Sequence, residues 1–165
     1  GGSTPDLAFV VENAEQMRIT AAGIVTTPNQ PAFLAALGTS QTLSTTDTLV
    51  ACTAEKMDVG NNHNTSTGRY TAPVTGKYMV TWGGTIMMQG LELYATVYLN
   101  KNGANGGYPR LRGNNAGSGT AYSGETVNIP IPLSAGDYIE LRAYSNGSGA
   151  SLNASEFQFG VYLLG

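Results

Sequence analysis

The residue types that most often carry enzymatic or metal chemistry are scarce in this sequence. His63 is the only histidine and Cys52 the only cysteine, so one chain cannot build a Cys/His zinc cluster or a pair of histidine ligands. His63 lies in a loop of Asn, Thr and Gly residues, which favours a solvent-exposed side chain. A three-fold site with one histidine from each of three chains is the alternative. Cys52 lies in the apolar run LVACT (49–53) without a base partner, and this indicates a buried structural thiol rather than a nucleophile.

Serine and carboxylate chemistry is not favoured either. A Ser-His-Asp triad would have to use His63, and no serine stands in a Gly-Xaa-Ser-Xaa-Gly motif. The 11 acidic residues leave a pair of carboxylates for glycan cleavage open as an alternative. However, we expect Asp137 to be a turn residue and Glu140 to occupy a solvent-facing strand position. The sequence therefore predicts a protein that is not an enzyme.

Calcium is the one metal that the sequence could accommodate. Asp58, Asn61, Asn62 and nearby loop carbonyls could supply hard oxygen ligands. The Asp-Xaa-Asp-Xaa-Asp-Gly pattern is absent, and Asp58 is better interpreted as an acid that caps the local backbone at a strand end. We expect a metal-free loop and no cofactor, with structural calcium as the alternative.

The segment GGYPRLRGNNAGSGTAY (106–122) is the most promising binding surface in the sequence. Tyr108, Arg110, Arg112 and Tyr122 bring planar side chains into a Gly-rich, mostly uncharged stretch, which we expect to be a loop. Such side chains suit stacking on sugars or pairing with anionic groups, so these four are the candidate receptor-binding residues. The alternative is a strand with two solvated arginines and one interfacial tyrosine.

Composition excludes two classes of partner. Only 12% of the residues are charged, and the formal net charge is −3, so there is no basic stripe for nucleic acid. No apolar run approaches the ~20 residues that cross a bilayer, and the N-terminus lacks the pattern of a signal peptide, so no membrane insertion is expected. Residues 1–3, Gly-Gly-Ser, are interpreted as an expression remnant.

The elements that must position these residues are strands. The chain has 22 glycines, and its apolar residues alternate in short runs bounded by turn signals. The sequence predicts strands at Leu7–Val11, Gln16–Thr20, Ala32–Ala36, Leu49–Thr53, Gly68–Thr71, Gly76–Gly83, Leu91–Leu99, Thr126–Leu133, Tyr138–Tyr144 and Glu156–Leu164. Trp82 is expected in the core, and Asn100-Lys-Asn-Gly103 is a turn signature. Short antiparallel strands without helices favour an all-β sandwich or jelly roll, whose edges oligomerisation could cover.

Several ordered segments resemble the complement C1q/tumour necrosis factor-like family. They are MDVGNNHNTSTGRYTAPVTGKYMVTWG (57–83), PAFLAAL (31–37), ATVYLNKNG (95–103) and IPIPLSAGDYIELRAY (129–144). The resemblance covers roughly residues 31–165. It implies a jelly roll of about ten antiparallel strands that assembles as a compact homotrimer.

The preceding segment AEQMRITAAGIVTTP (14–28) resembles a repeat of bacteriophage tail-fibre and tail-spike proteins. The two resemblances imply a fibre or stalk segment at 4–30 and a head domain at 31–165. Together they imply the tip of a trimeric tail fibre in the virion, which is expected to contact other fibre segments and to recognise a bacterial surface glycan or protein by multivalent loop contacts. A trimerisation and capping domain without receptor contact is the alternative, and a bacterial or animal soluble recognition protein is a further one.

Overall fold

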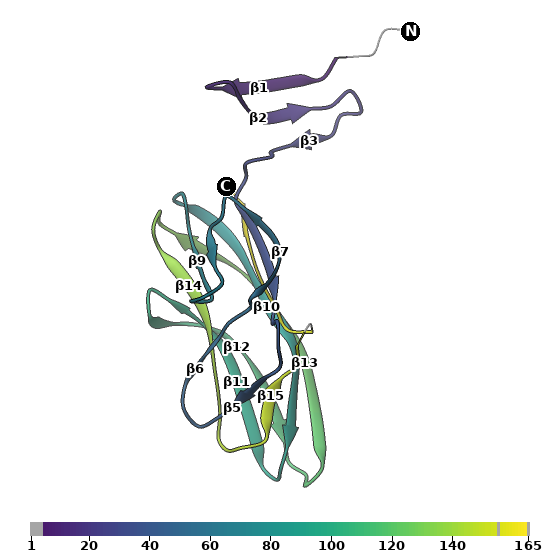
Figure 1. Ribbon diagram of the computed structural model, residues 1–165, viewed down its shortest axis with the longest axis vertical. Coiled ribbons are helices and arrows are strands. Elements are labelled where there is room, and N and C mark those ends of the chain that lie inside the picture. Colours follow the sequence, from purple (N-terminus) through teal and green to yellow (C-terminus); the bar gives the residue numbers. More distant parts are fainter. Residues whose placement is uncertain (1–4, 155, 165) are drawn as a thin grey trace. The chain divides into compact units, whose positions relative to one another are not determined.

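The computed structural model describes residues 5–154 and 156–164 (Figure 1). Within these residues all regular structure is β-strand, and no helix is long and apolar enough to cross a membrane. The chain divides into two compact units, Gly1–Gln30 and Pro31–Gly165.

The first unit is a small antiparallel sheet of β1 (Leu7–Val11), β2 (Ala14–Ile19) and β3 (Val25–Thr26). Glu12 and Asn13 both have positive φ, 51° and 64°, and form the two-residue turn between β1 and β2. Arg18 lies 2.7 Å from Asp6 and also pairs with Glu15, which ties β2 to the residue that precedes β1.

The second unit is built from two antiparallel sheets. The β10 sheet consists of β5 (Gln41–Leu43), β15 (Ala150–Leu152), β10 (Gly76–Gln89), β16 (Gln158–Leu163), β4 (Ala32–Ala36), β7 (Ala54–Val59) and β13 (Thr120–Leu133). The β11 sheet consists of β12 (Ala104–Asn115), β11 (Leu93–Lys101), β14 (Tyr138–Ser145), β9 (Arg69–Thr71), β8 (His63–Asn64) and β6 (Thr48–Val50). This arrangement confirms the predicted all-β jelly-roll sandwich.

Strand β10 organises its sheet because it changes partner halfway along. It pairs with β13 over its whole length. Its other edge is shared, first by β16 opposite Tyr78–Gly83 and then by β15 opposite Ile86–Met88. Gly83 and Gly84 lie at this change of partner, where neighbouring backbone comes close. A Cβ on Gly84 would lie 2.3 Å from the carbonyl oxygen of Glu156.

The core lies between the two sheets and follows the period-two alternation of a half-buried strand. Tyr78, Val80 and Trp82 of β10 point inward and are at most 1% exposed, which confirms the core position of Trp82. Val97 and Leu99 of β11 contribute from the facing sheet and are fully buried.

The strands differ from the predicted ones mainly in length and number. The β10–β13 pair extends well beyond the predicted segments, and the short strands β3, β5, β7, β8 and β15 were not predicted. The segment at 106–122 is not a loop, because it forms most of β12 and the start of β13, in agreement with the strand alternative. The predicted turn after β11 is confirmed, with Asn102 and Gly103 at φ 52° and 79° in a tight hairpin.

Candidate ligand-binding surface

The outward face of the β11 sheet carries a group of tyrosines and arginines. Because side chains alternate along a strand, burying Ala95, Val97 and Leu99 of β11 turns Tyr94 and Tyr98 to the opposite face. The neighbouring strands complete the group. We call it the Arg–Tyr face and define it by Tyr94, Tyr98, Arg110, Arg112 and Tyr144.

The two arginines of this face lie over tyrosine rings. Arg110 is the cross-strand partner of Tyr98, and its Cζ lies 4.9 Å from the centre of that ring. Arg112 lies diagonally over Tyr94, with its Cζ 4.3 Å from the ring centre. Contacts of this kind attract the guanidinium to the negative face of the ring and restrict its motion. Tyr144 on β14 meets Tyr94 and Tyr98 edge-on, with 6.3 Å between ring centres in each pair.

A partly buried charged network adjoins the face. Arg69 lies 2.8 Å from Glu140, and the guanidinium of Arg142 lies 3.2 Å from Asp47 and 3.8 Å from Glu140. Glu140 is only 4% exposed, so its prediction as a solvent-facing residue was wrong: it shares a face with two arginines that shield it from water. Burial, followed by a hydrogen bond with Asp47, raises the pKa of Tyr98 to about 12, so its ring stays neutral at physiological pH.

The four predicted receptor-binding residues do not lie together. Arg110 and Arg112 share the Arg–Tyr face, and both are exposed. Tyr108 is half-buried against the core, because residues 106–109 form a bulge between two points of β11–β12 pairing. Tyr122 is 68% exposed, but it lies on β13 in the other sheet. Their role in receptor binding stays a prediction.

Sequence reasoning missed the tyrosines that accompany the arginines. Tyr94 and Tyr98 stand four residues apart in the alternating run LELYATVYL (91–99), and this spacing places both on the same face of a strand. The hairpin turn that follows this run indicates that β12 returns alongside it. The register of this hairpin cannot be obtained by counting residues from the turn. The bulge adds residues to β12, so that Arg110 becomes the partner of Tyr98.

The loop around His63 is more ordered than predicted. The side chain of His63 is fully buried, its Nδ1 lies 2.9 Å from Glu55 Oε1, and its ring stacks on Phe33 with 4.1 Å between ring centres. The prediction of an exposed histidine was therefore wrong, since an Asn/Thr-rich sequence does not reveal that the ring packs under the loop. Asp58 accepts hydrogen bonds from the backbone N–H groups of Asn62 and His63 at 3.0 and 2.9 Å, which confirms it as a local cap.

Two further predictions about single residues are confirmed. Cys52 is fully buried, and burial raises the pKa of its thiol to about 12, so it is a structural thiol and not a nucleophile. Asp137 caps a turn: its carboxylate accepts a hydrogen bond from the backbone N–H of Ser134 and lies 2.8 Å from Lys101 Nζ. In the described part of the chain, no three His, Cys, Asp or Glu residues converge in a group that could hold a metal.

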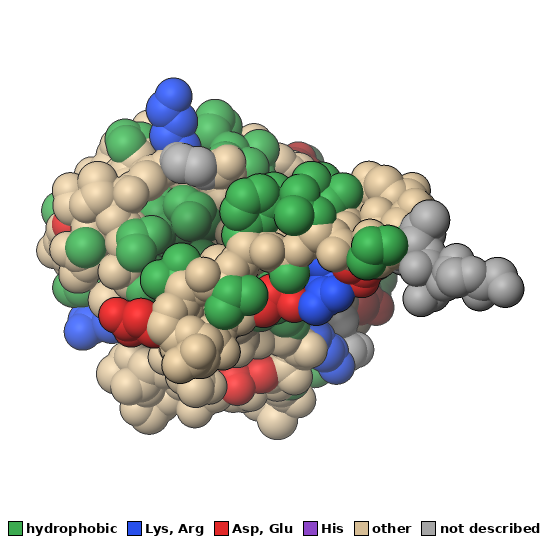
Figure 2. Space-filling model, turned by 90° about the horizontal axis from the view of Figure 1, so that it is seen from above, with side chains coloured by type: hydrophobic (Ala, Val, Ile, Leu, Met, Phe, Trp, Pro, Cys, Tyr) green, Lys and Arg blue, Asp and Glu red, His purple; other side chains and the backbone are tan. Residues whose placement is uncertain are grey.

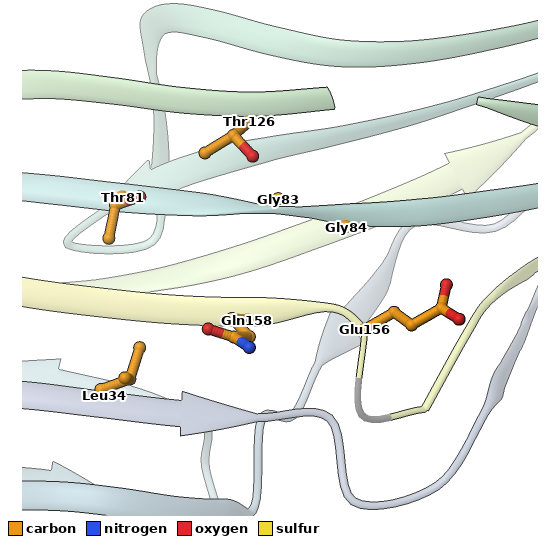
Figure 3. A pocket seen from close by; sticks show the side chains of 7 residues that line it. All are labelled: Leu34, Thr81, Gly83, Gly84, Thr126, Glu156 and Gln158. Atoms are coloured by element: carbon orange, nitrogen blue, oxygen red, sulfur yellow. The ribbon is translucent and has the colours of Figure 1, made fainter. Parts of the chain in front are cut away.

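A shallow hollow of about 270 Å³ lies on the outward side of the β10 sheet (Figure 3). It is lined by Leu34, Thr81, Gly83, Gly84, Thr126, Glu156 and Gln158. Figure 3 shows Thr126 on one side of the two glycines and Gln158 and Leu34 on the other. Hydrogen bonds with Thr85 and then Asn153 lower the pKa of the Glu156 carboxyl. The lining thus consists of hydroxyl, amide and apolar groups around one carboxylate.

Comparison with known proteins agrees with this architecture. The chain is similar to the globular domain of zebrafish complement 1qA protein, with a TM-score of 0.59 and 15% sequence identity over 82% of this chain and 98% of that chain. At this identity the similarity shows the fold alone. A search of curated proteins found no significant match. The family model described as the C1q domain matches residues 32–164, which is nearly all of the second unit. The chain therefore belongs to the C1q domain family.

Proposed function

We propose that this chain is the tip of a homotrimeric bacteriophage tail fibre and that it binds a glycan or protein on the bacterial surface without enzymatic activity. The observation that carries the binding role is the Arg–Tyr face, where two exposed arginines lie over tyrosine rings. Planar, amphipathic side chains that are already held in position lose little entropy when a ligand binds, and Tyr and Arg are enriched at binding hot spots for this reason.

Three copies of one face would act together. A single face of this size offers modest affinity, but a trimer whose faces reach the same cell surface gains avidity through effective concentration. A dense and repetitive surface glycan suits this mode, because each face then meets an equivalent ligand.

The fibre assignment is supported by the first unit. Its large apolar side chains are exposed on the isolated chain, with exposed fractions between 49% and 60%: Leu7, Phe9, Val10, Val11, Ile24 and Val25. Hydrophobic side chains are visible at the molecular surface in Figure 2. The two faces of β1 both carry such residues, and a sheet of three short strands cannot cover both. Further copies of the same segment would cover them, as in a stalk of three chains.

The same exposed residues favour a second candidate function, which is trimerisation and capping of the fibre. In that role the domain sets the register of the three chains of the fibre and closes its end, while receptor contact takes place elsewhere. The two functions are compatible. They differ in whether the Arg–Tyr face binds a receptor.

Two measurements on the full chain test the proposal. Light scattering should give about 52 kDa, three times the 17.2 kDa of one chain. Fluorescently labelled protein should then decorate particular strains in a panel of Gram-negative and Gram-positive bacteria, and Arg110→Ala should weaken this binding. Lys56→Ala is the matched control, since Lys56 is an exposed cation on β7 in the other sheet. A trimer that binds no strain favours capping, and a monomer contradicts both roles.

A further inference from the structure

Arg110 and Arg112 differ from the other cationic residues that adjoin the β11 sheet, because neither has an acidic partner in the described part of the chain. Arg69 pairs with Glu140, Arg142 pairs with Asp47, and Lys101 pairs with Asp137. The protein carries three more acidic than basic residues, so the missing partners of these two arginines do not reflect a general lack of carboxylates in the chain. These two arginines contact tyrosine rings, but no carboxylate in the described part of the chain pairs with their positive charge.

We infer that the ligand of the Arg–Tyr face is an anionic saccharide, whose carboxylate or phosphate group is held by Arg110 and Arg112. This inference rests on the proposed recognition function of the same face and specifies the class of its ligand. A neutral glycan would use the tyrosines, but it would leave both guanidinium groups without a partner of opposite charge.

The geometry fits one anion or two neighbouring anions. The two arginines are separated by one residue, so their Cα atoms are about 7 Å apart along β12 and both side chains leave the same face of the strand. Each guanidinium uses one face to contact a tyrosine ring, which leaves its N–H groups at the edge free to donate. A carboxylate or phosphate accepts a pair of such N–H groups in a bidentate arrangement.

The tyrosine rings supply the second part of the recognition. Tyr94, Tyr98 and Tyr144 form a continuous aromatic row beneath and beside the arginines. Tyr98 is only 8% exposed and lies under Arg110. The rings that can pack against the C–H face of a sugar are therefore the half-buried Tyr94 and Tyr144, while the arginines hold the charged substituent of the sugar. Uronic acids and phosphorylated sugars share this combination of an apolar ring face and an anionic group.

The test uses the whole 165-residue chain and three defined probes. Trigalacturonic acid provides carboxylates, mannose 6-phosphate provides a phosphate, and maltotriose is the neutral control. Titrations are followed by NMR on the arginine Nε–H signals and by calorimetry for affinity. Arg110→Gln, Arg112→Gln and Arg110→Lys are compared with Lys56→Gln, which removes one positive charge from the other sheet.

We expect at least one anionic probe to bind and to shift the signals of both arginines, while maltotriose causes neither effect. Each Arg→Gln variant should bind about tenfold more weakly, since a charge-assisted hydrogen-bond pair is lost. Lys56→Gln should bind like the wild type. Arg110→Lys should be intermediate, because it keeps the charge but loses the planar donor. The preferred probe distinguishes a carboxylate ligand from a phosphate ligand.

The failure of this inference can be told apart from the failure of the proposed function. If wild type and both Arg→Gln variants decorate cells equally, the inference and the binding role of the Arg–Tyr face are both overturned, and host recognition would then use another surface of the chain. If the anionic probes bind through both arginines but no strain is decorated, the inference holds and the host-binding role fails. Binding of maltotriose as strong as that of the anionic probes would also overturn the inference. Unchanged thermal unfolding of the variants would exclude a loss of folding as the cause of weaker binding.

Discussion

Gly84 lies where β10 changes partner, and replacing it with alanine should destabilise the domain strongly. The added Cβ would lie 2.3 Å from the carbonyl oxygen of Glu156 and 2.5 Å from the Cα of Phe157. Both atoms belong to the backbone, so neither can rotate away as a flexible side chain could. Gly84 also has φ +147°, a conformation that residues with a side chain rarely adopt.

The magnitude follows from these two effects. Real Cβ atoms essentially never come closer than 3.0 Å to such neighbours, so the chain segments at Gly84 and Glu156 must separate by about 0.7 Å. Overpacking of this kind costs about 1–3 kcal/mol, and the unfavourable φ adds about 1–3 kcal/mol. We therefore expect Gly84→Ala to lower the free energy of unfolding by about 2–6 kcal/mol, the sum of the two effects.

Urea denaturation at one fixed protein concentration measures this difference. Gly124→Ala is the matched control, because a Cβ on Gly124 of β13 meets nothing within 4 Å and no positive φ is involved. That variant should stay within about 0.5 kcal/mol of the wild type. If Gly84→Ala were equally harmless, the close approach of the two chain segments would not be a feature of the folded protein.

Three other predictions concern single side chains. His63→Ala should lower the free energy of unfolding in urea by about 2–4 kcal/mol, because it empties the space of a buried ring that stacks on Phe33. Glu140→Ala should cost about 1–2 kcal/mol in the same assay, since it leaves Arg69 without its partner although that guanidinium stays partly hydrated. The contacts of Asp137, chiefly with a lysine, lower the pKa of its carboxyl to about 2, below the ordinary 3.8. Its stabilising effect is therefore complete above about pH 4 and lost as the pH falls towards 2, so the stability gap between wild type and Asp137→Asn, followed by thermal unfolding, should close over that range.

The architecture could be predicted because local signals agree with it. Alternation in runs such as LELYATVYL, the Asn102-Gly103 turn and the absence of helical periodicity all indicate antiparallel strands. Strand lengths were less predictable. Gly83 and Gly84 resemble a strand end in sequence, but here they allow one long strand to continue past a change of partner.

The binding surface was predictable only in part. Arg110 and Arg112 could be identified from their planar, charged side chains in a Gly-rich segment, although that segment was expected to be a loop. In the strand that it forms, their spacing places both on one side. Tyr108 shares that spacing, yet a bulge turns it towards the core, and a bulge depends on pairing with a strand that is distant from the local sequence pattern. Tyr122 lies near in sequence but belongs to the other sheet. Which residues share a face is thus decided by strand pairing rather than by distance along the chain.

The most direct test of the central claim compares the cell-binding affinities of two variants on one strain that the wild-type trimer decorates. The recognition account predicts that Arg110→Gln binds about tenfold more weakly than Lys56→Gln, although both lose a single positive charge. Equal affinities would contradict the account, because the Arg–Tyr face would then play no part in attachment.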